Sequence, residues 1–262
     1  SPDTSSLMRA LLVVWLGIAP TGGFRIDFGS TRWARLQREL DELPAFTCVN
    51  QAGEPLGYER DGKQLAIFFA DADRAEQELA MANGKFPELG LRIIGVGLGE
   101  TYRRCADGMA LLVPGAAALE AAGDEWKDDS QLPLFTCLAM SRPRDGDGPS
   151  ETETPLFMDP SMAAATLSNT RETAERSAGG ELPAEVEAQL QVVCTSLDKA
   201  IELVLSGKEA ETCGDCFGFV PPRRSIEFLQ AQQRKAGGSG GTVVPADWAR
   251  GGAASGGGIF PE

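Results

Sequence analysis

The feature that most constrains the fold of this chain is a repeat of four apolar motifs, which occur in the same order in its two halves. Such a repeat indicates that one structural unit is present twice. The spacing between copies grows from 89 residues at the first motif to 107 at the last, and the extra residues fall in polar stretches, where loops tolerate insertion. The matched pairs are LPAFTC at 43–48 with LPLFTC at 132–137, IFFAD at 67–71 with PLFMD at 155–159, LRIIGVGL at 91–98 with LQVVCTSL at 190–197, and ALLVP at 110–114 with FGFVP at 217–221.

Local signals divide each half into the same succession of strand, strand, helix, strand, short helix, strand and helix. Asp71 and Asp159 are expected to cap the helices that follow the second motif, and Pro160 suits the first position of its helix. The prolines that end the fourth motif in each half are expected to precede helices over 116–122 and 225–232.

These elements predict the fold class. The segment 53–63 carries Gly and Asp between apolar runs, which is typical of a hairpin. Apolar strands must be covered on at least one face, so each half is expected to be a sheet with helices against it. We therefore expect an α+β fold that is internally duplicated, with pseudo-symmetric halves at 43–122 and 123–235.

Residues 1–42 are expected to form a docking extension of two helices. The run 7–19 is apolar apart from one arginine, and as a helix it would rise about 20 Å, which is too short to cross a bilayer. It packs on the protein's own core, docks on a partner, or lies at a membrane interface. A second, amphipathic helix is expected from Ser30 or Thr31 onward. The candidate docking residues of the first helix are Leu11, Val14 and Trp15.

The C-terminal segment 236–262 is a Gly-rich tail with nine glycines. Alone, such a composition is typical of a flexible coil. Its few apolar side chains would serve as anchors if the tail lay extended along a large partner. The candidate docking residues here are Trp248, Ile259 and Phe260.

The composition argues against nucleic-acid binding and against most catalysis. The net charge is −14, so a basic surface for phosphates is not expected. The chain has no histidine, which removes the commonest general base, the usual nucleophile pairs and most zinc sites. No constellation of carboxylates or lysines takes their place. We expect a protein without catalytic residues, metal or cofactor.

Four groups of residues invite a chemical interpretation. Cys213 and Cys216 form a CxxC, which is a structural pair, a disulfide or redox handle, or part of a metal site. Cys48 and Cys137 occupy equivalent motif positions, which favours burial over reactivity. The glycines of 95–99 resemble a phosphate loop, but their counterparts in the second half are not glycines, so close backbone packing is the preferred explanation. The acidic clusters are expected to be solvated loops without calcium-binding spacing: Asp124, Glu125, Asp128 and Asp129, and Asp145, Asp147, Glu151 and Glu153.

The motifs, from LPxFTCxN through φφφVP, resemble those of the twenty-two-kilodalton component of the translocon at the inner chloroplast envelope and its cyanobacterial relatives. The resemblance covers about residues 43–230 and lies in strand motifs, whereas the two terminal extensions depart from the family pattern. It implies a non-enzymatic plastid protein of the envelope intermembrane space that helps precursor proteins cross, with a chaperone-like part. It also implies protein partners and peripheral membrane association.

An alternative keeps the same fold but changes the role. The chain would be a structural, peripheral subunit of a large plastid membrane complex, such as a photosynthetic complex of the thylakoid, anchored by its two termini. A third hypothesis is an enzyme that uses carboxylates or the CxxC.

Overall fold

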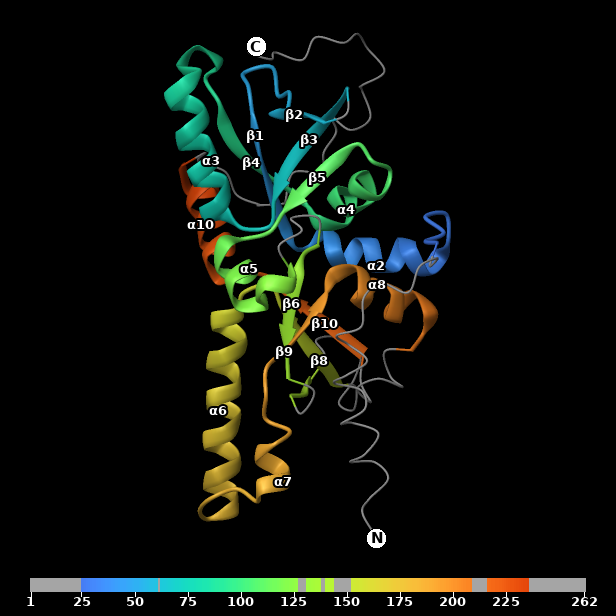
Figure 1. Ribbon diagram of the computed structural model, residues 1–262, viewed down its shortest axis with the longest axis vertical. Helices are drawn as coiled ribbons and strands as arrows, with labels where there is room; N and C mark the ends of the chain where they lie inside the picture. The colour runs from blue at the N-terminus through green and yellow to red at the C-terminus, as the bar shows by residue number, and fades with distance from the viewer. Residues whose placement is uncertain are drawn as a thin grey trace.

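Two five-stranded sheets form the body of the computed structural model, one above the other in Figure 1. The structure describes residues 25–60, 62–126, 131–137, 140–143, 152–208 and 216–235. The first sheet contains β1 (Pro44–Val49), β2 (Gly57–Arg60), β3 (Lys63–Phe69), β4 (Arg92–Gly97) and β5 (Ala110–Val113). The second contains β6 (Pro133–Thr136), β7 (Arg142–Pro143), β8 (Thr152–Phe157), β9 (Val193–Ser196) and β10 (Cys216–Val220).

The strand pairings of the first sheet recur in the second. In the first sheet β1 is antiparallel to β3 and β4, β2 is antiparallel to β3, and β5 is parallel to β3. In the second sheet β6 is antiparallel to β8 and β9, β7 is antiparallel to β8, and β10 is parallel to β8. The hairpin expected at 53–63 is present, but β2 and β7 add to each sheet a fifth strand that the motifs alone did not predict.

The register of the repeated motifs is also the same. Phe46 lies opposite Phe69 in the first sheet, and Phe135 lies opposite Phe157 in the second. One hydrogen bond outside the ladders recurs as well: the hydroxyl of Thr47 donates to the Ile67 carbonyl at 2.7 Å, as the Thr136 hydroxyl does to Pro155 at 2.7 Å. The four motifs therefore form strands with equivalent partners in the two sheets.

The helices predicted from residue 31 and over 116–122 begin as predicted, whereas the helix predicted over 225–232 begins two residues earlier and the short helix at 184–187 was not predicted. Their bounds are α2 (Thr31–Asp41), α3 (Ala72–Lys85), α4 (Leu98–Ala106), α5 (Ala116–Ala122), α6 (Pro160–Ala178), α7 (Ala184–Glu187), α8 (Leu197–Ser206) and α10 (Arg223–Lys235), with short 3-10 turns at η1 (Pro87–Leu89) and η2 (Asp124–Trp126). The side chains of Ser30, Asp71 and Asp159 cap α2, α3 and α6, which confirms these three N-caps. Pro160 is the first residue of α6, where its missing N–H costs nothing.

One large apolar core joins the two sheets. The helices α2, α4 and α8 lie together on the right of Figure 1 and pack against both sheets. Trp33, Leu36 and Leu40 of α2 are at most 1 % exposed in this core. The buried side chains that meet them come from both halves: Phe68, Leu98 and Leu112 from the first, and Leu134, Leu156, Ile201 and Phe217 from the second.

Two smaller cores lie on the opposite faces of the sheets. One contains Phe46, Cys48 and Phe69 under α3 and α10, and the other contains Phe135, Cys137 and Phe157 under α5 and α6. Cys48 and Cys137 are fully buried, as their repeated positions predicted, and burial raises the pKa of the Cys48 thiol to about 12.

The prediction that Glu153 lies in a solvated loop is wrong. Glu153 is on β8 and is 8 % exposed. It lies beside Gly218 of the parallel neighbour β10, where a Cβ atom would collide with the Glu153 carboxyl group. A glycine at 218 therefore makes room for a carboxyl group inside the sheet, which a count of acidic residues along the chain does not reveal.

Candidate functional site

The last helix of each half lies on the sheet of the other half. The helix α5 follows β5 of the first sheet but packs on β6 and α6, with Ala118 in the core around Phe135. The helix α10 follows β10 of the second sheet but packs on α3, beside it in Figure 1. There Phe228 meets Phe46 edge-on at 5.6 Å between ring centroids, and the Gln232 amide donates to the Ile93 carbonyl at 3.3 Å. This exchange interlocks the halves.

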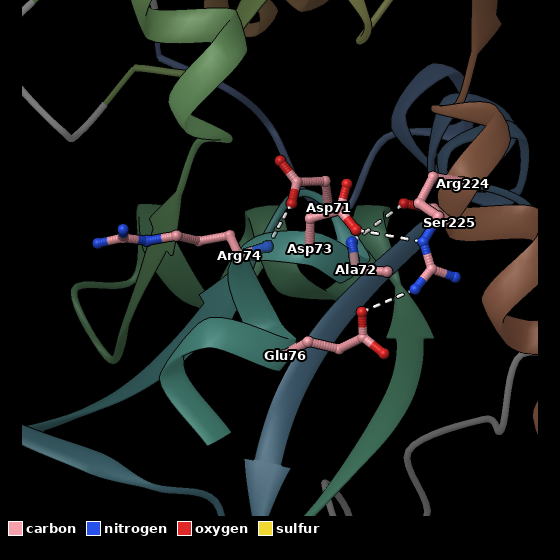
Figure 2. A network of polar contacts seen from close by, with 7 residues as sticks. All are labelled: Asp71, Ala72, Asp73, Arg74, Glu76, Arg224 and Ser225. Carbon is pink, nitrogen blue, oxygen red and sulfur yellow. Dashed lines mark hydrogen bonds and ion pairs between the residues drawn. The ribbon is translucent and has the colours of Figure 1, made fainter. Parts of the chain in front are cut away.

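A polar network holds α10 to the start of α3 (Figure 2). The Ser225 hydroxyl, which is fully buried, accepts a hydrogen bond from the Ala72 N–H at 3.2 Å. Figure 2 shows Arg224 reaching from α10 to two acids of α3, with 3.2 Å to the Asp73 carboxylate and 2.8 Å to Glu76. The network thus satisfies a helix N–H that would otherwise be buried without an acceptor.

In the second half, the equivalent helix start has no buried N–H that needs an acceptor. Pro160 stands at the position equivalent to Ala72 and has no N–H to satisfy. Ala118 stands at the position equivalent to Ser225 and has no hydroxyl to accept a bond. Donor and acceptor are therefore present together in one half and absent together in the other.

The glycines at 95, 97 and 99 make room for neighbouring side chains. The Asp41 carboxylate at the end of α2 accepts the Glu100 N–H at 2.9 Å, and a Cβ atom at Gly97 or Gly99 would collide with it. At Gly95 a Cβ atom would meet the Leu229 side chain of α10 at 2.6 Å. The packing explanation is confirmed, and the start of α4 is already occupied by a carboxylate. Burial raises the pKa of Asp41 above its usual value.

A cavity of about 200 Å³ lies between the two halves, and it is the candidate functional site. Its walls come from α4, β5, the residue before β6 and the first two residues of α8. The lining residues are Tyr102, Cys105, Ala106, Ala110, Leu111, Leu112, Leu132, Leu197 and Asp198. The lining is apolar except at one side, where the Tyr102 hydroxyl donates to the Asp198 carboxylate at 2.8 Å.

The polar groups in the lining of this pocket are a phenol, a thiol and a carboxylate. Burial raises the pKa of the Cys105 thiol to about 12, so the thiol is protonated and a poor nucleophile at neutral pH. Burial, together with the Asp198 charge, raises the pKa of Tyr102, so the phenol remains a donor. Among the described residues, no group of three or more Cys, Asp or Glu side chains is placed to hold a metal ion. The volume suits one apolar side chain of a bound segment.

The docking residues predicted from the termini lie outside the described residues: Leu11, Val14, Trp15, Trp248, Ile259 and Phe260. Cys213 does so too, whereas Cys216 begins β10 with its sulfur 3.4 Å from the Thr152 carbonyl oxygen. None of the helices that the structure describes is both long enough and apolar enough to cross a membrane.

Sequence reasoning did not find the pocket. Tyr102 and Asp198 belong to the short helices that follow the third motif in the two halves, so the repeat marks these helices as equivalent. Only the packing of the halves brings Tyr102 of the first helix within hydrogen-bond distance of Asp198 of the second.

Two solved structures have a similar fold. Tic22 from Plasmodium falciparum matches with a TM-score of 0.54 and 18 % identity, covering 78 % of this chain and 99 % of its own. Anabaena Tic22, described as a protein-transport protein, matches with a TM-score of 0.52 and 16 % identity, covering 76 % of this chain and 96 % of its own. The chain matches no protein-family model and no curated protein sequence. The resemblance that the motifs indicated is therefore confirmed at the level of the fold, which is that of the Tic22 structures.

Proposed function

We propose that this chain is a non-enzymatic plastid protein that takes part in the transport of precursor proteins by binding their extended segments. The observation that carries the proposal is the apolar cavity between the halves, whose Cys105 thiol is protonated and a poor nucleophile at neutral pH. The protein-transport description of the Anabaena structure supports the same role. By the family resemblance, the chain would act in the envelope intermembrane space with peripheral membrane association.

We also infer that the two halves arose from one duplicated unit. Three independent features support this inference: the matched strand pairings, the matched threonine hydrogen bonds and the reciprocal exchange of α5 and α10. A duplicated unit with exchanged helices gives a pseudo-symmetric molecule whose binding cavity lies where the halves meet. The cavity therefore depends on both copies.

The test of the proposed function is to fill the cavity. Ala106 ends α4, lines the cavity and is exposed, so a tryptophan there would occupy binding space without entering the core. Burying one large apolar side chain stabilises a complex by about 1.5–3 kcal/mol, so Ala106→Trp should weaken the binding of an unfolded precursor about ten-fold or more.

The matched control is Ala80→Trp, at an exposed position of α3 on the opposite face of the first sheet. The measurement is the suppression of aggregation of a denatured precursor, together with its dissociation constant. Equal binding by wild type and Ala106→Trp would place the binding site elsewhere, and the absence of any binding by wild type would refute the proposed function.

A further inference from the structure

Asp198 is an exposed carboxylate on the lining of an otherwise apolar cavity. It belongs to the first turn of α8, but it is not the cap of that helix. The Ser196 hydroxyl caps α8 by accepting the Lys199 N–H at 3.0 Å. The position of Asp198 is thus not explained by the capping of its own helix.

The first half of the chain holds this carboxylate in place. The Tyr102 hydroxyl reaches across from α4 and donates to one oxygen of Asp198 at 2.8 Å. This hydrogen bond fixes the orientation of the Asp198 carboxyl group. Its contact with Tyr102 fixes it at the rim of the cavity.

The surroundings offer no compensating positive charge on the cavity wall. None of the residues that line the cavity is a lysine or an arginine. Lys199, which follows Asp198 on α8, is paired with Glu202 at 3.1 Å, and Arg104 of α4 is paired with Glu100 at 3.1 Å. The chain as a whole has a net charge of −14, which adds a long-range attraction for cations.

We propose that the cavity selects segments in which an apolar side chain is adjacent to a lysine or an arginine. The apolar side chain would enter the cavity, and the basic group would meet the Asp198 carboxylate at the rim. This inference rests on the proposed function, because it assumes that extended polypeptide is the ligand. Charge complementarity between one oriented carboxylate and one cation carries it.

The experiment compares three labelled peptides that are identical except beside the apolar residue, where they carry Lys, Gln or Glu. Their dissociation constants are measured by fluorescence anisotropy at low and high salt. An exposed ion pair stabilises by up to about 1 kcal/mol, so the Lys peptide should bind about two- to five-fold more tightly than the Gln peptide at low salt. The Glu peptide should bind more weakly than both, and high salt should reduce the differences.

The variant Asp198→Asn keeps an acceptor for Tyr102 and removes the charge. It should bind the Lys and Gln peptides with similar affinities, so that the preference for Lys is lost. The control Glu172→Gln removes one charge from an exposed position on α6 and should leave the preference unchanged.

The outcomes separate the two ideas. If all three peptides bind equally to wild type, or if Asp198→Asn keeps the preference, the selection by Asp198 is refuted while the proposed function stands. If none of the peptides binds and no unfolded precursor is bound either, the proposed function itself fails.

Discussion

Replacing Ser225 should expose how far the fold depends on the exchanged helix α10. Ser225 is fully buried, and its hydroxyl is the acceptor for the Ala72 N–H at 3.2 Å. Ser225→Ala leaves this N–H buried without a partner, and such an orphaned group costs about 1–3 kcal/mol. The expected result is a lower free energy of unfolding by that amount. The measurement is urea denaturation followed by tryptophan fluorescence, with Trp33 as a buried reporter.

The second half of the molecule suggests the compensating change. There the equivalent residues are Pro160 and Ala118, which lack both the donor and the acceptor. Asp71 already has extended backbone angles (φ −136°, ψ 160°), as a residue before proline requires. In the double variant Ala72→Pro/Ser225→Ala no N–H remains to be satisfied, and the smaller alanine leaves space for the proline ring.

A double-mutant cycle measures the coupling between positions 72 and 225. The double variant should lose less free energy of unfolding than the two single variants lose together, by about 1 kcal/mol or more. The reason is that each single change leaves either an unpaired donor or a crowded hydroxyl. Additive effects within about 0.3 kcal/mol, or a loss of less than that in Ser225→Ala, would show that the bond between the halves contributes nothing. Unchanged m values in all variants would serve as the control for a common unfolding transition.

Two further predictions concern buried titratable groups. Burial, and the nearby charges of Asp73 and Asp159, raise the pKa of Asp71, so the folded state holds this proton more tightly than the unfolded chain. The stability that Asp71 contributes is therefore full below its unfolded pKa and is lost as the pH rises through its folded pKa. The variant Asp71→Asn keeps an acceptor for the Arg74 N–H. Between pH 4 and pH 8 its urea denaturation midpoint should fall less than that of wild type. An equal pH slope in both proteins would contradict this. Burial raises the pKa values of Cys48 and Cys105 to about 12. Both thiols should therefore react with iodoacetamide at pH 8 at least ten-fold more slowly in the folded protein than after denaturation, as measured by peptide mass spectrometry. Labelling at equal rates in the folded and unfolded protein would disprove their protection.

The elements that the sequence predicted correctly depend on neighbouring residues. Asp71 and Asp159 cap their helices because a carboxylate at that position meets an N–H two or three residues later. The burial of Trp33, Leu36 and Leu40 follows from their helical spacing. The four strand motifs were visible for a similar reason, since each is a short apolar run between turn residues.

The errors and omissions concern contacts between distant segments. Glu153 was expected in a solvated loop, but its strand pairs with β10, which follows more than sixty residues later. β7 has two residues, which are too few to show the alternation of apolar and polar residues that indicates a strand. The role of Gly97 became clear only with Asp41, which approaches it from the end of α2.

The sequence alone determined the number of motifs, their order and the N-caps Ser30, Asp71 and Asp159, because these depend on short-range periodicity and capping. The exchange of α5 and α10, and the meeting of Tyr102 with Asp198, were decided only by the tertiary structure. The 96 residues that separate Tyr102 from Asp198 carry no local signal of their contact. Their distance in space is set by the packing of two sheets on one shared core, where apolar burial outweighs any preference of the isolated segments.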